Sequence, residues 1–285
     1  MSITVKNLSY TYMPGTPFEH QALKNVSFEI ADGEFVGIIG HTGSGKSTLI
    51  QVISGLLDGA QGQVLIGGVD YMAKKADRKQ LRRTLGVVFQ YPEYQLFEET
   101  VEKDVAYGPR KMGVPESEIA GRVRVALEHV GIDYELYKDK SPFSLSGGQK
   151  RKIAIAGVLA MEPSILILDE PIAGLDPMGR ENFMQLSRDL NETGITILMI
   201  SHNMDNLAEY AGRVLVMKGG ELYLNGTPKE VFAQEEKLLA AGLDLPEAAK
   251  LAGQLRARGM DVPQGIIRYD EMLGYLTEKL GGREQ

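Results

Sequence analysis

The chain has 285 residues, of which 43% are hydrophobic and 24% are charged, with a formal net charge of -7 and no cysteine. These proportions are ordinary for a soluble protein with a buried core, and the length fits one large domain, with or without a small appendage. The lack of cysteine excludes disulfides and thiolate chemistry, and no apolar run reaches the roughly 18 residues of a transmembrane helix. The acidic balance argues against a general binder of nucleic acid.

Three strands are predicted at the start of the chain, ITVKNLSYTY, VSFEI and EFVGIIG, the first two separated by a polar loop. Helical spacing of apolar residues begins at Leu49, and the short strands VLIGG and LGVVFQ follow. Apolar residues on one face then predict a helix from Glu116 to Gly131, and SLSGGQ opens another that runs through Ala160.

Two continuous apolar runs, ILILDE and TILMIS, are typical of strands buried on both faces of a parallel sheet. VLVMKGGELYLNG predicts a hairpin, and Thr227 and Glu230 have the spacing of a capping box. Beyond about residue 240, LPEAAKLAGQLRARG and YDEMLGYLTEKL predict two helices joined by a turn region. The alternation of strands and helices predicts an α/β core with parallel strands.

Residues 40–47, GHTGSGKS, match a phosphate-binding P-loop between a predicted strand and a predicted helix. In this pattern backbone N–H groups and the helix start face the phosphates, Lys46 reaches the β- and γ-phosphates, and the Ser47 hydroxyl is a ligand of Mg²⁺. A plain glycine-rich turn is the alternative, but the whole context predicts a nucleoside triphosphate site. The candidate nucleotide-binding residues are Gly40, His41, Thr42, Gly43, Ser44, Gly45, Lys46, Ser47 and Thr48.

The strand ILILDE ends in two carboxylates, Asp169 and Glu170. Open α/β sheets bind ligands at the carboxyl ends of their strands. Asp169 suits the Mg²⁺-holding role, directly or through water, and Glu170 suits the orientation and polarisation of an attacking water. Solvated acids at an ordinary strand end are the alternative. Beside a P-loop, the pair predicts phosphoryl transfer.

Residues 145–149, LSGGQ, predict a second anion-binding helix start in the same chain. Ser146 suits a helix N-cap, and the two glycines expose backbone N–H groups. One triphosphate needs only one P-loop. An ordinary turn followed by a helix is the alternative interpretation of this segment.

The P-loop, LSGGQ and ILILDEP, in this order, resemble the nucleotide-binding domain of ABC ATPases over roughly residues 1–235. In that family two subunits enclose two ATP·Mg²⁺, and the LSGGQ of one subunit closes over the ATP on the P-loop of the other. The resemblance therefore implies an ATP hydrolase with ATP and Mg²⁺ as cofactors. It also implies nucleotide binding by Ser146, Gly147, Gly148 and Gln149.

Single residues of this chain also match further positions of the family. Tyr12 matches the aromatic residue that stacks on adenine, Gln90 the glutamine that senses Mg²⁺ and water, and His202 the switch histidine at the γ-phosphate. Asp176 lies in the loop that communicates between the two sites. For Tyr12, Gln90 and His202, an ordinary structural role is the alternative. The resemblance thus implies catalytic roles for Glu170, His202 and Gln90, and metal binding by Ser47, Gln90 and Asp169.

Two further sequence details bear on these roles. Ile172 departs from the family, which usually has threonine there, but the position lies outside the expected phosphate contacts. The histidines His20 and His129 match no family position.

Residues 89–109, 154–163 and 169–177 are similar to the ATPases of energy-coupling factor (ECF) transporters, and YPEYQLFEETV is similar to their second, or A-prime, ATPase. Those importers carry vitamins and transition metals with two ATPases, a transmembrane scaffold and an exchangeable substrate-binding membrane subunit. The resemblance implies these partners, with a heterodimer expected and a homodimer left open. It also implies a peripheral place at the cytoplasmic face of a bacterial cell membrane.

We therefore predict an α/β fold with a P-loop NTPase core of ABC ATPase type over residues 1–240, including an antiparallel β subdomain and a helical signature subdomain at about 92–160. A small helical appendage is expected over 241–285. The expected function is the ATP-hydrolysing subunit of an ECF importer for vitamins or transition-metal ions. The alternatives are the ATPase of another importer, such as a dedicated cobalt or nickel transporter, a non-transport ABC ATPase, and an assembly protein gated by ATP.

Overall fold

The computed structural model describes residues 1–73 and 77–281. Its strands form two sheets, a four-stranded antiparallel sheet in the order β2-β1-β4-β5 and a six-stranded sheet in the order β10-β9-β3-β8-β7-β6. The strands are β1 (Ile3–Tyr12), β2 (His20–Ile30), β3 (Phe35–Ile39), β4 (Gln61–Ile66), β5 (Val69–Asp70), β6 (Leu85–Val88), β7 (Ile165–Asp169), β8 (Thr196–Ile200), β9 (Arg213–Lys218) and β10 (Glu221–Gly226).

The helices between these strands are of very different lengths. They are α1 (Lys46–Ile53), α2 (Arg78–Thr84), η1 (Pro92–Gln95), α3 (Val101–Met112), α4 (Glu116–His129), α5 (Tyr134–Tyr137), η2 (Pro142–Ser144), α6 (Gly147–Leu159), α7 (Pro177–Glu192), α8 (Met204–Tyr210), α9 (Pro228–Phe232), α10 (Glu235–Ala240), α11 (Glu247–Ala257) and α12 (Tyr269–Gly281). Within the described parts of the chain, none of these helices combines the length and hydropathy needed to cross a bilayer.

The six-stranded sheet is parallel from β9 to β6, and only β10 runs antiparallel to its neighbour. Alternate side chains of each central strand enter opposite clusters. In β7, for example, Ile165 and Ile167 pack with the antiparallel sheet and α1, while Leu166 and Leu168 pack with the helices of the other face. Burial on both faces explains why these strands are continuous apolar runs.

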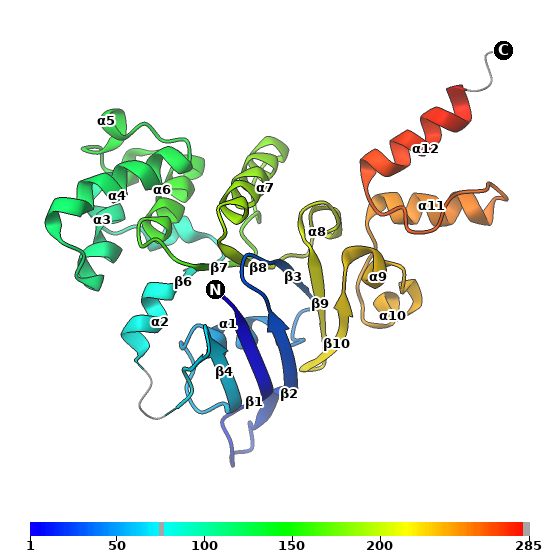
Figure 1. Cartoon of the computed structure of the whole chain (residues 1–285), viewed down its shortest axis with the longest axis horizontal. Helices are drawn as coiled ribbons and strands as arrows, with labels where there is room; N and C mark the ends of the chain where they lie inside the picture. Colours follow the sequence, from blue (N-terminus) through cyan, green and yellow to red (C-terminus); the bar gives the residue numbers. More distant parts are fainter. Residues whose placement is uncertain (74–76, 282–285) are drawn as a thin grey trace.

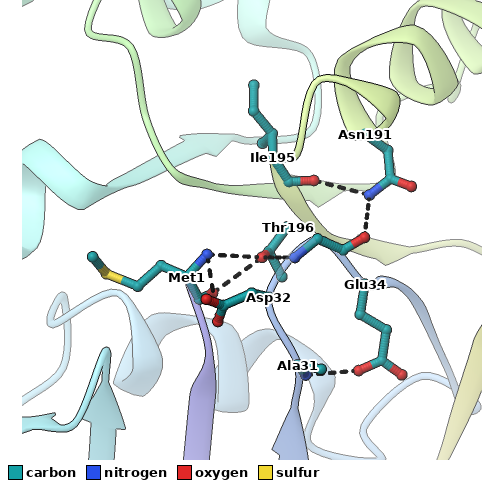
Figure 2. Close-up of polar contacts among 8 residues, drawn as sticks. Met1, Ala31, Asp32, Glu34, Asn191, Ile195 and Thr196 are labelled. Atoms are coloured by element: carbon teal, nitrogen blue, oxygen red, sulfur yellow. Dashed lines mark hydrogen bonds and ion pairs between the residues drawn. The ribbon is translucent and has the colours of Figure 1, made fainter.

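The loop before β3 is fixed to the last turn of α7 and the first residue of β8 (Figure 2). The Thr196 hydroxyl accepts from the N–H of Gly33 at 2.9 Å and donates to the carbonyl of Met1 at 3.0 Å. The Asn191 amide donates to the carbonyls of Gly33 and Ile195, both at 2.9 Å. These bonds hold the start of β3, the strand that leads into the P-loop.

The helices fall into groups on opposite sides of the molecule (Figure 1). Helices α3 to α6 gather on one side, and α11 and α12 project from the other, with α7 and α8 between them. The first group coincides with the expected helical subdomain at about 92–160. The division of the chain into domains stays a prediction.

The last two helices have a small hydrophobic cluster of their own, which includes Ala248, Ala252 and Met272. Leu251, three residues after Ala248 on α11, is exposed instead of joining this cluster. A hydrogen bond joins the segment before α12 to α8: the Arg268 guanidinium donates to the carbonyl of Ala208 at 2.9 Å. The expected appendage over 241–285 includes residues 282–285, which lie outside the described residues.

Most predicted elements are confirmed, including the parallel strands, the hairpin of β9 and β10, and the two C-terminal helices. The capping box at Thr227 and Glu230 is present. Strand β2 begins at His20 rather than near Val26, because its alternating residues extend the pairing with β1 as far as Tyr12. No pattern of their own in the sequence predicted β5, α2, η1 or the longer helix α3.

Candidate nucleotide-binding and catalytic site

The P-loop connects β3 to α1 and surrounds a buried lysine. Lys46 is 6% exposed, and its ammonium donates to the carbonyls of Gly40 at 2.6 Å and His41 at 3.1 Å. Burial lowers the pKa of Lys46, and the nearby carboxylates of Glu170 and Asp169 partly offset this effect. A desolvated cation whose hydrogen-bond acceptors, among the described residues, are two carbonyls favours an anionic ligand.

Two glycines of the P-loop have no room for a side chain. A Cβ at Gly40 would lie 2.5 Å from the carbonyl oxygen of Met217 on β9. At Gly45 it would lie 2.7 Å from the carbonyl oxygen of Ala22, and the φ of +102° is left-handed. The loop therefore packs tightly between β9 and β2, and this packing fixes the start of α1.

Two of the three catalytic candidates, Glu170 and His202, meet at the ends of β7 and β8. Glu170 Oε1 lies 2.8 Å from His202 Nε2. The backbone of Glu170 has a φ of +48°, a left-handed conformation that costs roughly 1–2 kcal/mol in a residue with a Cβ. It is held there by its N–H, which donates to the carbonyl of Ile200 at 3.1 Å. Such strain is typical of functional sites.

Asp169 ends β7 directly before Glu170. Burial raises the pKa of the Asp169 carboxyl, and the charge of Glu170 raises it further, while Lys46 and His202 act in the opposite direction. A divalent cation beside this carboxylate would stabilise its ionised form. The hydroxyl of Ser47, which lines the P-loop cavity, adds an oxygen donor of the kind that Mg²⁺ prefers. These residues fit Mg²⁺ binding.

A cavity of about 200 Å³ brings the P-loop and the catalytic pair together. The Tyr12 hydroxyl, at one wall, lies 3.2 Å from the Thr48 hydroxyl. His20 also lines this cavity, although it matched no family position and lacked a sequence signal that could have singled it out. The lining residues are Tyr12, His20, Ala22, Thr42, Gly43, Gly45, Lys46, Ser47, Thr48, Glu170 and His202.

The LSGGQ segment lies elsewhere on the same chain. Ser146 is the N-cap of α6 and forms a capping box with Gln149, whose amide also donates to the Tyr137 hydroxyl at 2.9 Å. Ser146, Gly148 and Gln149 line a separate cavity of about 410 Å³ between α6 and α7. Gly147 is exposed at the first turn of α6. Asp176, the N-cap of α7, also lines that cavity.

Gln90 follows β6, is exposed and does not line the P-loop cavity. The next residues turn sharply, since Tyr91 has a φ of +54°, and then form the short helix η1. The apolar residues after η1, Leu96 and Phe97, could either pack in the core or form the wall of a groove for the membrane scaffold, and the structure separates them. Leu96 is buried in the core, whereas Phe97 is 56% exposed and lies edge-on against Tyr107, with the ring centroids 4.8 Å apart.

Comparison with known proteins agrees with this geometry. The ABC transporter family model matches residues 23–173. An ECF transporter ATP-binding protein EcfA2 of Clostridium perfringens is 53% identical over 98% of both chains. The solved structure of CbiO1 of Clostridium perfringens, described as part of the ABC transporter complex CbiONQ, has a TM-score of 0.73 and 43% identity, covering 88% of this chain and 98% of that one.

A second solved structure is the dimeric ATP-binding cassette MJ0796 bound to ADP and phosphate. It has a TM-score of 0.69 and 31% identity over 79% of this chain and 98% of that one. The expected fold class is confirmed, and so are the two resemblances on which it was based. The chain belongs to the ABC transporter family and, within it, to the EcfA2-type ATP-binding proteins of energy-coupling factor transporters, and it is an ATP-hydrolysing enzyme.

Proposed function

We propose that the chain powers an ECF importer by closing on a second ATPase subunit over two ATP·Mg²⁺. The observation that carries this proposal is the separation of the two halves of the site. Lys46, Glu170 and His202 share one cavity, whereas Ser146 and Gly148 line another. The nucleotide site at this P-loop would be complete only when a second subunit brings its own signature segment to it.

In this proposal the P-loop N–H groups and Lys46 hold the phosphates, and Tyr12 stacks on the adenine. Ser47 and Asp169 would hold Mg²⁺, which supplies neutralisation of phosphate charge when it is bound. Gln90 lies outside the cavity in this conformation and would approach the metal and the water as the subunits close. The closure would also bring Ser146, Gly147, Gly148 and Gln149 to the partner's nucleotide.

Glu170 is the residue proposed to act on the attacking water. Its carboxylate would orient the water and accept its proton as the oxygen bonds to the γ-phosphorus and the bond to the bridging oxygen breaks. His202, which lies 2.8 Å from Glu170, would hold the carboxylate and donate to the γ-phosphate. Asp176 would carry the state of one site to the other across the subunit interface.

The surface around η1 is the proposed contact with the transmembrane scaffold. Tyr94 and Phe97 are exposed there, and Tyr107 on α3 lies beside Phe97. Exposed aromatic residues in a cluster favour a protein partner. Because η1 follows Gln90 directly, movement at the nucleotide would reach the scaffold through this segment. The chain would then be peripheral, on the cytoplasmic face of a bacterial membrane, with an exchangeable subunit selecting the vitamin or metal ion.

Co-purification tests this proposal. The tagged chain is extracted from membranes in mild detergent, and its partners are identified by mass spectrometry. We expect a second ABC ATPase, one polytopic scaffold and several small membrane proteins. The variant Phe97→Asp should reduce recovery of the scaffold several-fold, whereas Leu239→Asp, at an exposed position of α10, should not. Recovery of no membrane protein would contradict the proposal.

A further inference from the structure

Arg151 is an unusual residue for the second turn of α6. It is 5% exposed, and among the described residues only it and Lys46 are basic side chains within the buried set. Lys46 has an evident ligand, the nucleotide phosphates, whereas Arg151 lies outside the P-loop cavity and lines, with Ser146 and Gln149, the separate cavity. Burial of a guanidinium is costly unless its charge is paired and its donors are used, so its position needs an explanation.

Three segments of the chain meet at Arg151. Its Nη1 donates to the carbonyl of Ala173, in the loop after β7, at 2.8 Å. Its Nε lies 3.9 Å from the carboxylate of Glu93 on η1. The same two segments also touch directly, because a Cβ at Gly174 would lie 3.6 Å from the ring of Tyr91. The Arg151 side chain therefore joins three segments: α6, the helix that begins at the LSGGQ segment and is called the signature helix below, the segment after Gln90, and the loop after Glu170.

The ion pair is incompletely formed in this conformation. Arg151 Nε and Nη2 and Glu93 Oε2 have no hydrogen-bond partner among residues 1–73 and 77–281. Burial lowers the pKa of Arg151 despite the opposing charge of Glu93. A separation of 3.9 Å becomes a hydrogen bond with a relative movement of about 1 Å. Such a pair is weak in one arrangement of η1 and α6 and strong in another.

The loop that Arg151 holds leads directly to the catalytic carboxylate. The N–H of Ala173 donates to the carbonyl of Glu170 at 3.2 Å, and Glu170 itself is held in a strained conformation. We propose, resting on the function proposed above, that Arg151 is a positioning residue that couples the signature helix and η1 to the placement of Glu170. Closure of the pair with Glu93 fixes the loop, and Glu170 then holds the attacking water.

The test compares ATP turnover with ATP affinity in the complex that co-purifies with the full chain. The variants are Arg151→Gln, Arg151→Lys and Glu93→Gln. Arg122→Gln is the matched control, since Arg122 on α4 also has an ion pair, with Glu162 at 3.0 Å. Affinity is measured with a fluorescent ATP analogue in the absence of Mg²⁺, and folding by thermal unfolding.

We expect Arg151→Gln to lower kcat about tenfold or more, as a misplaced catalytic group does, with an ATP affinity within about threefold of the wild type. Arg151→Lys should recover part of the rate, because a lysine reaches one of the two acceptors. The effects of Arg151→Gln and Glu93→Gln should not add in the double variant. Arg122→Gln should leave the rate unchanged.

Turnover of Arg151→Gln within twofold of the wild type, or an equal loss of ATP affinity and rate, would overturn the role of Arg151. A parallel Glu170→Gln variant separates this from failure of the proposed function. If Glu170→Gln is inactive while Arg151→Gln is fully active, only the coupling is wrong. If Glu170→Gln keeps full turnover, the proposed role of Glu170 fails, and the coupling fails with it.

Discussion

The environment of Lys46 indicates how the site recognises phosphate. Its ammonium is desolvated and has two backbone carbonyls as its partners in this conformation, and burial lowers its pKa. Exchange of these carbonyls for anionic oxygens would stabilise the charge. We expect Lys46→Met to weaken ATP binding roughly 10- to 100-fold, the range that one charge-assisted hydrogen bond supplies. Titration with a fluorescent ATP analogue measures this, with Lys6→Met, at an exposed position of β1, as the control. An ATP affinity of Lys46→Met equal to that of the wild type would contradict this prediction.

The raised pKa of Asp169 predicts a cost to stability in the absence of nucleotide and metal. A carboxyl whose pKa is higher in the folded than in the unfolded chain destabilises the fold where it is ionised. The cost is fully present above the folded-state pKa and absent below the unfolded value, about 3.9. Asp169→Asn should therefore raise the Tm of the ligand-free chain at pH 7, and the difference should shrink as the pH falls.

Thermal unfolding over a pH series checks this prediction. Asp139→Asn, which replaces an exposed carboxylate, controls for the loss of one negative charge. A lower Tm for Asp169→Asn than for the wild type at pH 7 would show that the carboxylate stabilises the ligand-free fold.

At the scale of elements, helix starts are set by local side chains. Thr227 and Glu230 form a complete capping box at α9, at the position that the spacing in the sequence predicted. Thr227→Ala should lower the free energy of unfolding by about 1 kcal/mol, and Thr227→Ser should retain most of it because the hydroxyl is kept. Urea unfolding of the two variants measures the difference. Equal stability of Thr227→Ala and the wild type would contradict the capping role.

The sequence predicted best those features that depend on residues close together in the chain. The P-loop, the carboxylates at the end of β7 and the cap at Ser146 depend on neighbouring residues, and the structure has each of them at its predicted element. By contrast, β5 and η1 are short, and contacts with the rest of the fold determine their conformation. The pairing of Arg151 with Glu93 joins residues far apart in the sequence, so no local pattern could have indicated it. The same holds for His20 at the P-loop cavity.

At the scale of the whole molecule, the two proposed halves of the nucleotide site lie in different cavities of one chain. The helices that carry the signature segment and the strands that carry the P-loop are distinct parts of the fold (Figure 1). This arrangement supports the proposal that the chain works with a second ATPase subunit, because neither cavity contains both the phosphate cradle and the signature residues. In the proposed mechanism, contacts between the parts, such as that of Arg151 with Ala173, would transmit closure to the catalytic residues.

The rate of phosphate release by the purified complex, with wild-type chain and with Glu170→Gln, tests the central claim most directly. Because Arg151 is proposed to act through Glu170, the account predicts that Glu170→Gln lowers the rate at least as much as Arg151→Gln, about tenfold or more, while ATP binding to this chain is kept. A Glu170→Gln complex that releases phosphate at the wild-type rate would contradict it.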